Sequence, residues 1–191
     1  MGRGTILYRP EGPIAVEDVM PGNQILLRDG RYAPLLWRGS MTMPRAHGNS
    51  GPVRRVLTRI TADALGVGRP MQDLILGPAA RLHHHAPDIR RLTGTPDAYI
   101  PACDFVDGNQ FIALRPKAAV DLYQLGFAQH ETLIASGVGI ESLHPDNAFN
   151  LGLRANAMSQ YLALFPHLTS LEEVGPPRHP RLRLHDLDSP G

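Results

Sequence analysis

The stretch from Gly4 to Arg31, GTILYRPEGPIAVEDVMPGNQILLRDGR, decides the fold class of this chain. It predicts three short strands: Thr5 to Tyr8, a second strand that ends at Val19, and Gln24 to Arg28. Turns rich in Pro and Gly separate them, and Asp29-Gly30 closes a tight hairpin because glycine adopts positive φ without steric cost. The chain therefore begins as a small, tightly wound β-structure with its amino terminus as the first strand.

The composition indicates one domain of ordinary size with many short strands. The 191 residues include 18 Pro and 19 Gly, scattered along the chain. The net charge of +1 gives no electrostatic footprint for nucleic acid or a membrane surface. The single cysteine, Cys103, excludes an internal disulfide. We find no signal peptide and no apolar run long enough to span a bilayer, and expect a cytoplasmic protein or one exported without a cleaved N-terminal signal.

Further strands are expected along the rest of the chain. Alternating or apolar runs predict strands at the following places: Tyr32–Arg38 with Trp37 as core anchor, Val53–Ile60, Leu74–Leu76, Ala98–Val106, Phe111–Leu114 and Thr132–Ala135. The apolar spacing in Val53–Ile60 fits a helix almost as well as a strand. Ser40–Pro52 is expected to be a loop, and Asp88–Asp97 to be polar and rich in turns.

The period changes near the C-terminus. Met158, Tyr161, Leu162 and Phe165 form one apolar stripe at helical spacing. We therefore expect a single β domain over residues 1–168, with a helical segment at about 145–166, and a flexible Pro- and Arg-rich tail over 169–191.

Several blocks of sequence, in a fixed order, resemble one known family. The opening stretch is followed by Leu36-Trp37-Arg38-Gly39, by ITADALGVG from Ile60, and by a block from Val120 that contains His130-Glu131 and ends in Ile140-Glu141-Ser142. Together they are similar to a Hint domain, the hedgehog/intein self-processing module, and most of all to its non-splicing bacterial branch. The resemblance implies an all-β, horseshoe-like disc with pseudo-two-fold symmetry and one or two short C-terminal helices.

The resemblance also implies where the chemistry would be, and two groups of the family pattern are missing. The family's nucleophilic Cys would stand one place before Met1, about five residues ahead of Thr5. The family's Ser-Pro-Gln-His aligns with Gly77 to Ala80, so Ala80 replaces the His that activates the first peptide bond. An amide nitrogen is a poor leaving group unless it is protonated, and imidazole suits that task.

The remaining candidate site residues each have a structural and a functional reading. His83, in the run His83 to His85, is a candidate surrogate for the missing imidazole or a metal ligand; the alternative is a solvated loop. His130 stands where inteins carry a His, or is a hydrogen-bonded His that supports the closing hairpin. Cys103 beside Asp104 is a candidate nucleophile or a small, partly buried thiol.

Two functions from different classes follow. The first is a degenerate Hint domain that keeps the fold, lacks self-cleavage and acts as a structural or interaction module. The second is an active autoprocessing module, in which a thiol just upstream of Met1 attacks the preceding carbonyl and the thioester is hydrolysed or transferred. We favour the first, with no cofactor and no metal, and with the chain's own flanking polypeptide or an unknown protein as partner.

Overall fold

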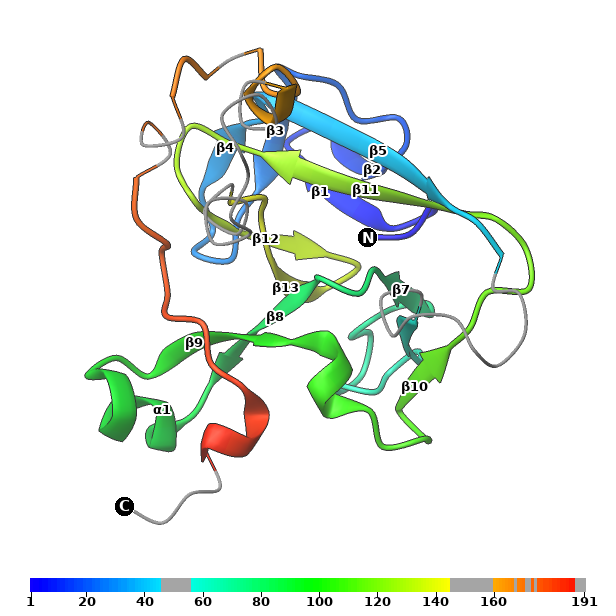
Figure 1. Ribbon diagram of the computed structural model, residues 1–191, viewed down its shortest axis with the longest axis vertical. Helices are drawn as coiled ribbons and strands as arrows, with labels where there is room; N and C mark the ends of the chain where they lie inside the picture. The colour runs from blue at the N-terminus through cyan, green and yellow to red at the C-terminus, as the bar shows by residue number, and fades with distance from the viewer. Residues whose placement is uncertain (46–55, 145–159, 167, 171–172, 174, 188–191) are drawn as a thin grey trace.

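The computed structural model describes residues 1–45, 56–144, 160–166, 168–170, 173 and 175–187. Within these ranges the protein is mainly β, with few short helical elements, which confirms the predicted fold class (Figure 1). The named strands pair antiparallel in small sheets of two to four strands. Short strands joined by tight turns are what the Pro- and Gly-rich sequence predicts.

The opening stretch forms two hairpins. β1 (Ile6–Arg9) pairs with β2 (Gly12–Ala15), and β3 (Gln24–Leu26) pairs with β4 (Tyr32–Pro34). The second hairpin turns at Gly30, whose φ of 85° favours glycine. The sequence predicts that the second strand ends at Val19, but β2 ends at Ala15. A turn follows, in which the Ala15 carbonyl accepts a hydrogen bond from the N–H of Asp18.

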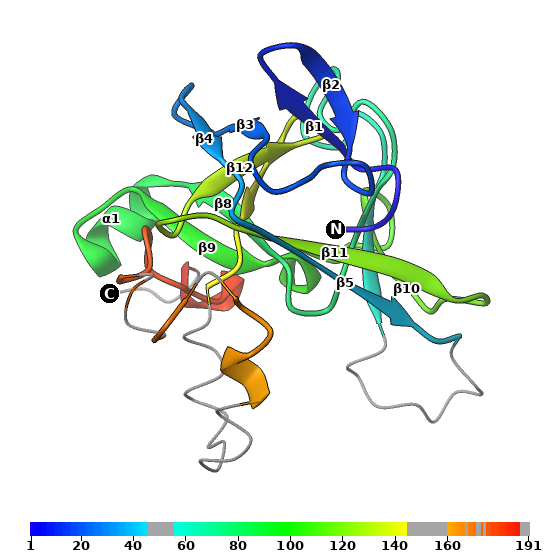
Figure 2. The same cartoon turned by 90° about the horizontal axis from the view of Figure 1, so that it is seen from above.

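A long ribbon of two strands crosses the molecule (Figure 2). β5 (Trp37–Met43) pairs with β11 (Val120–Gly126) over seven residues each. β5 therefore continues into residues for which the sequence predicts a loop. Gly39 lies under the Trp37 indole, and a Cβ at that position would come within 2.0 Å of the ring.

The other half of the chain builds two further sheets. The first has the order β10-β6-β7 and the second the order β12-β13-β8-β9. The strands are β6 (Leu57–Ile60), β7 (Leu74–Leu76), β8 (Arg81–His85), β9 (Asp97–Pro101), β10 (Phe111–Leu114), β12 (Thr132–Ala135) and β13 (Val138–Glu141).

Two sequence predictions in this half are wrong, and a third is wrong in part: the strand predicted over Ala98–Val106 ends at Pro101, after which Ala102–Phe105 form a 3-10 helix. The first concerns His83 to His85: the structural alternative was a solvated loop, but these residues form the end of strand β8 and pair with β9. The other is the turn-rich segment after it, which contains helix α1 (Pro87–Thr93). Pro87 is at the start of that helix and Gly94 ends it with a φ of 82°, both favourable helix-end residues.

One main hydrophobic core joins the sheets. It draws on the opening hairpins, on β6 and β7, and on the closing strands β12 and β13. Its fully buried members include Leu7, Ile25, Leu76 and Leu133. Side chains from both halves thus share one apolar interior, which holds the two halves together.

The C-terminal region packs on this body. The helix expected at 145–166 lies largely outside the described residues; at its end, residues 160–162 form a helical turn. Phe165 is buried and its ring lies 4.9 Å from that of Trp37, whose Nε1–H donates to the Leu164 carbonyl at 2.7 Å. The described residues 175–187 also depart from the flexible tail predicted for 169–191. They run along the domain and end in a short 3-10 helix, η4 (Leu184–Leu187), next to β9 (Figure 1).

Candidate functional site

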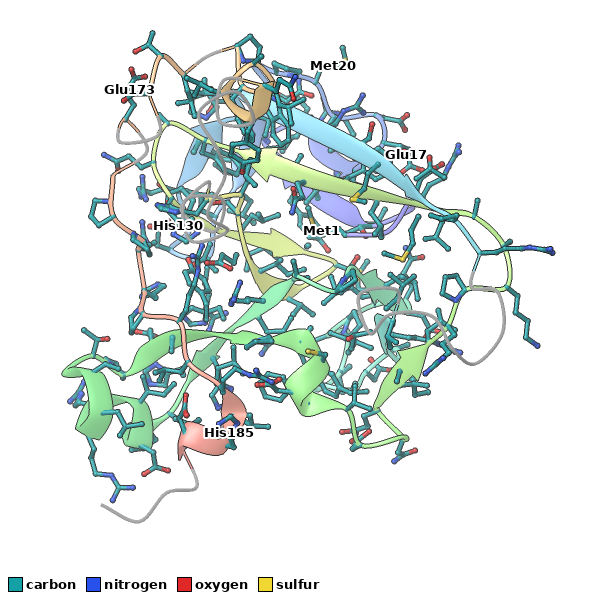
Figure 3. The ribbon with its side chains drawn as sticks, viewed as in Figure 1. Met1, Glu17, Met20, His130, Glu173 and His185 are labelled. Atoms are coloured by element: carbon teal, nitrogen blue, oxygen red, sulfur yellow. The ribbon has the colours of Figure 1, made fainter. Side chains whose placement is uncertain are left out.

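Met1 is buried inside the domain, where the chain start lies between strands β11 and β7 (Figure 3). Its amine donates to the Tyr123 carbonyl at 2.9 Å, and the Tyr123 N–H donates to the Met1 carbonyl at 2.7 Å. On the other side the Gly2 N–H donates to the Ile75 carbonyl at 2.7 Å. Burial lowers the pKa of the Met1 amine to about 5. The backbone at Met1 is therefore held by main-chain groups of β11 and β7.

Thr5, a candidate site residue, is buried just after this point. Its hydroxyl donates to the carbonyl of Gly2 at 2.6 Å, and its N–H donates to the same oxygen at 3.3 Å. Both contacts fix the turn that leads from Met1 into β1. In this geometry Thr5 shapes the backbone.

The turn from Gly77 to Ala80 lies near Met1, where the resemblance places the family's activating His. The Ala80 N–H donates to the Gly77 carbonyl at 3.0 Å, and the Ala80 carbonyl accepts from the Ala102 N–H at 2.9 Å. Ala80 is half-buried and packs against the main core. A methyl group has no proton to give, so this turn supplies backbone and apolar surface but no acid.

A cavity of about 430 Å³ connects these features. Its described lining includes Met1, Trp37, Gly77 to Arg81, Leu122 to Leu125, Ile140 to His144, Leu164 and Arg181. The lining thus brings the start of the chain, the Gly77–Ala80 turn and the end of β13 to one hollow. Its ionisable side chains are those of Arg81, Tyr123, Glu141, His144 and Arg181.

His130 lies next to this hollow and is fully enclosed (Figure 3). Its Nδ1 accepts the backbone N–H of Arg178 at 3.0 Å, so the neutral ring carries its proton on Nε2. Nε2 lies 3.4 Å from Oε1 of Glu141 and has no aligned hydrogen-bond partner among the described residues. The His144 ring packs against it at 4.7 Å. Burial, together with the nearby His144 and Arg181, lowers the pKa of His130 to about 3.

Glu141 is the buried acid of this group. Its Oε1 accepts from Arg181 Nε at 2.7 Å, and its Oε2 lies 3.7 Å from Arg81 Nη1. Burial raises the pKa of Glu141 while the arginines favour its ionised form. At neutral pH, His130 is therefore a neutral hydrogen-bond acceptor, and Glu141 is engaged by a guanidinium. Neither is a free proton donor.

His83 is held in a different place. Its ring is buried, with Nε2 3.0 Å from Asp97 Oδ1, and the same oxygen contacts His85 Nδ1 at 2.8 Å. Burial and the positive charge of Arg28 lower the pKa of His83 to about 4. His83 lines a second, smaller cavity of about 220 Å³, whereas Met1 and Ala80 line the larger one. The structure thus does not bring His83 to the missing imidazole's position.

Metal binding can be judged from the same side chains. His83 and His85 share Asp97, while His84 packs against the Phe105 ring at 5.6 Å. Across the ranges that the structure describes, no three or more His, Cys, Asp or Glu side chains are arranged to hold a metal ion.

Cys103 and Asp104 lie in the 3-10 helix η2 (Ala102–Phe105) after β9. The Cys103 thiol is exposed and its Sγ lies 3.7 Å from Asp104 Oδ1. Partial burial and the Asp104 carboxylate raise the pKa of Cys103, which disfavours the thiolate needed for nucleophilic attack. Asp104 is itself bound by Arg183 through two contacts of 2.7 and 2.8 Å.

Sequence reasoning missed the residues that bind the C-terminal segment. The sequence block from Val120 contains Glu131 and Glu141, but neither is a predicted site residue. Arg178 and Arg181 fall in the segment for which the sequence predicts a flexible tail. The available signal was the buried context of the two glutamates, since acids in an apolar block need partners. The structure supplies those partners from the C-terminal segment.

The comparisons with known proteins agree with this architecture. The chain is a mainly β domain of short strands, and its buried first residue lies beside the Gly77–Ala80 turn. The sequence profile of the Hint domain matches residues 1–147. The chain belongs to the Hint domain family. No curated protein matches it in sequence. No helix within the described part of the chain is long and apolar enough to cross a membrane.

Several solved structures are similar to the chain. The MchDnaB-1 intein shares 14% identity, with a TM-score of 0.46, and the similarity covers 74% of this chain and 98% of the intein. The gp41-1 intein shares 9% identity at a TM-score of 0.41, covering 74% and 98%. A bacterial intein-like domain from Clostridium thermocellum shares 8% identity at a TM-score of 0.44, covering 74% and 96%.

Proposed function

We propose that this protein is a degenerate Hint domain, which keeps the autoprocessing fold without self-cleavage and acts as a structural or interaction module. The observation that carries the proposal is the chemistry at the backbone of Met1. The groups that touch its nitrogen and its carbonyl are the main-chain carbonyl and N–H of Tyr123. A carbonyl oxygen accepts a hydrogen bond but cannot protonate a leaving amine.

The acyl shift asks more of this position than those groups offer. A thiol or hydroxyl must attack the carbonyl that precedes the scissile nitrogen, and a general acid must deliver a proton to that nitrogen as the C–N bond breaks. Ala80 stands where the family's imidazole would act. Loss of one general acid slows such a step by about 10² to 10⁴-fold.

The two candidate imidazoles, His130 and His83, do not offer a ready replacement. Nδ1 of His130 accepts the Arg178 N–H. Because the pKa of His130 is lowered to about 3, its ring is uncharged at neutral pH. His83 contacts Asp97 and lines the other cavity. These contacts favour a module that binds over one that cleaves, and its partner is the chain's own flanking polypeptide or another protein.

The proposal is tested by intact mass. The chain is fused behind its natural upstream segment or a small carrier, and its mass is followed for days with and without dithiothreitol. We expect the fusion to stay whole under both conditions. Cleavage at or next to Met1 would support active autoprocessing with an upstream nucleophile instead. The His83→Ala and His130→Ala fusions would then show which imidazole supplies the proton.

A further inference from the structure

The C-terminal segment 175–187 lies along the domain like a bound peptide (Figure 1). We propose that the edge of β9, together with the carboxylates of Glu131, Glu141 and Asp104, is a binding site for an extended arginine-rich peptide, and that residues 178–183 occupy it in cis. The inference deepens the proposed function, since it names the site through which an interaction module would bind.

The backbone contacts are those of an added strand. β9 is the last strand in the order β12-β13-β8-β9, so one of its edges is unpaired within the sheet. Along that edge the Tyr99 N–H donates to the Pro180 carbonyl at 2.8 Å, and the Tyr99 carbonyl accepts from the Leu182 N–H at 3.0 Å. Tyr99 thus forms a parallel bridge with Arg181. Peptide-binding domains use the same edge addition, in which the main chain supplies general affinity.

Three arginines of the segment each meet a carboxylate of the body. Arg178 Nη1 donates to Glu131 Oε2 at 2.7 Å, and Arg181 Nε donates to Glu141 Oε1 at 2.7 Å. Arg183 binds Asp104 through Nε and Nη2 in a two-pronged contact. Paired N–H contacts of this kind select arginine over lysine. The pattern Arg-x-x-Arg-x-Arg therefore matches three acids of the body, which lie just before β12, at the end of β13 and in η2.

Burial differs sharply between the two sides of this interface. The side chains of Glu131, Glu141 and Asp104 are only 5, 6 and 7% exposed, whereas those of their partners Arg178, Arg181 and Arg183 are 34, 16 and 57% exposed. None of the residues from 175 to 187 is fully buried. The three acids of the body are thus largely buried when the segment is in place, and the segment adds charge and hydrogen bonds with no fully buried residue of its own.

This asymmetry is the property of a receptor and its ligand. On the body, Arg31 lies 3.3 Å from Glu131 and Arg81 lies 3.7 Å from Glu141. The segment adds a second guanidinium to each of these acids and the one that binds Asp104, which offsets the cost of burying the carboxylates. The segment contributes none of the residues of the main hydrophobic core, so its release leaves the contacts within that core in place. Its tether supplies a local concentration of the order of millimolar, so a free peptide competes only when the cis segment is weakened.

The test uses the full chain and a labelled peptide. Fluorescence anisotropy measures binding of a fluorescein-labelled peptide with the sequence of residues 176–187 to the wild-type chain and to the double variant Arg181→Ala, Arg183→Ala. The variant weakens the cis segment and leaves all three acids in place. We expect it to bind the peptide about tenfold more tightly than wild type does. The matched control is the same peptide with the residues corresponding to Arg181 and Arg183 replaced by alanine, which should bind neither chain.

The outcomes separate the alternatives. Equal affinity of both chains, equal binding of both peptides, or no binding to the variant overturns the proposal. Hydrogen exchange on the wild-type chain gives a second reading that needs no variant. Raising the salt concentration should speed exchange at the Leu182 amide and leave the Tyr123 amide, which donates to Met1, unchanged. A Leu182 rate that does not respond to salt contradicts the proposal. Self-cleavage is read by mass and peptide binding by anisotropy, so failure of one is distinct from failure of the other.

Discussion

The enclosed imidazole of His130 should make the domain sensitive to acid, and the size of the effect follows from its pKa. The ordinary value is 6.5, and burial lowers it to about 3 in the folded chain. Between these two values the unfolded chain binds a proton that the folded chain does not. The stabilising effect is therefore complete above pH 6.5 and is lost as the pH falls toward 3.

The perturbation is a change from pH 7 to pH 5 in wild type and in His130→Asn. Asparagine keeps an acceptor oxygen near the position of Nδ1, so the Arg178 N–H retains a partner, but it does not titrate. Linkage gives a loss of about 2 kcal/mol in the free energy of unfolding of wild type from His130 alone over this interval. His83, whose pKa is lowered to about 4, adds a similar loss in both chains. The raised pKa of Glu141 opposes the trend equally in both.

Urea unfolding at the two pH values measures the difference. The free energy of unfolding of His130→Asn should fall by about 2 kcal/mol less than that of wild type between pH 7 and pH 5. His185, 73% exposed at its side chain, supplies the control, and His185→Asn should retain the wild-type response. If His130→Asn keeps the full pH dependence of wild type, the reasoning about the buried imidazole is refuted.

Two further changes test other parts of the structure. Gly39→Ala places a methyl group within 2.0 Å of the Trp37 ring, so we expect a loss of about 1–3 kcal/mol in the free energy of unfolding, measured by urea titration; an unchanged stability would contradict the packing of β5. Asp104→Asn removes the carboxylate that raises the pKa of Cys103, so alkylation of the thiol by iodoacetamide at neutral pH should become faster, measured by mass, and an equal or slower rate would contradict this cause.

The sequence predicted the β-class and most of the short strands, because both rest on local patterns. Leu74–Leu76, Phe111–Leu114 and Thr132–Ala135 are strands with the predicted ends. The errors fall where pairing over long distances overrides local composition. β5 reaches Met43 because β11 pairs with it along its length, and three histidines form a strand because β9 lies beside them.

The site was less accessible to sequence reasoning. The position of Ala80 could be aligned from the sequence, and in the structure Ala80 and Met1 line the same cavity. The contacts of His130 could not be predicted, because its Nδ1 partner is the backbone of Arg178, 48 residues away. A segment rich in Pro and Arg has the composition of a solvated tail, and only the buried acids on the body give it a place to bind.

The proposal is that this Hint domain has, among the residues that the structure describes, no group placed to protonate the first peptide nitrogen. The most direct test places a cysteine immediately before Met1, behind a carrier, and measures the fraction cleaved by intact mass in dithiothreitol. With Ala80 in place we predict that this fusion stays whole, whereas the same fusion with Gly77→Ser and Ala80→His releases the carrier. A Cβ at Gly77 would lie 3.2 Å from Leu122 Cδ1, a contact that the end of a flexible side chain can relieve. Release of the carrier by the cysteine fusion that retains Ala80 would contradict the account.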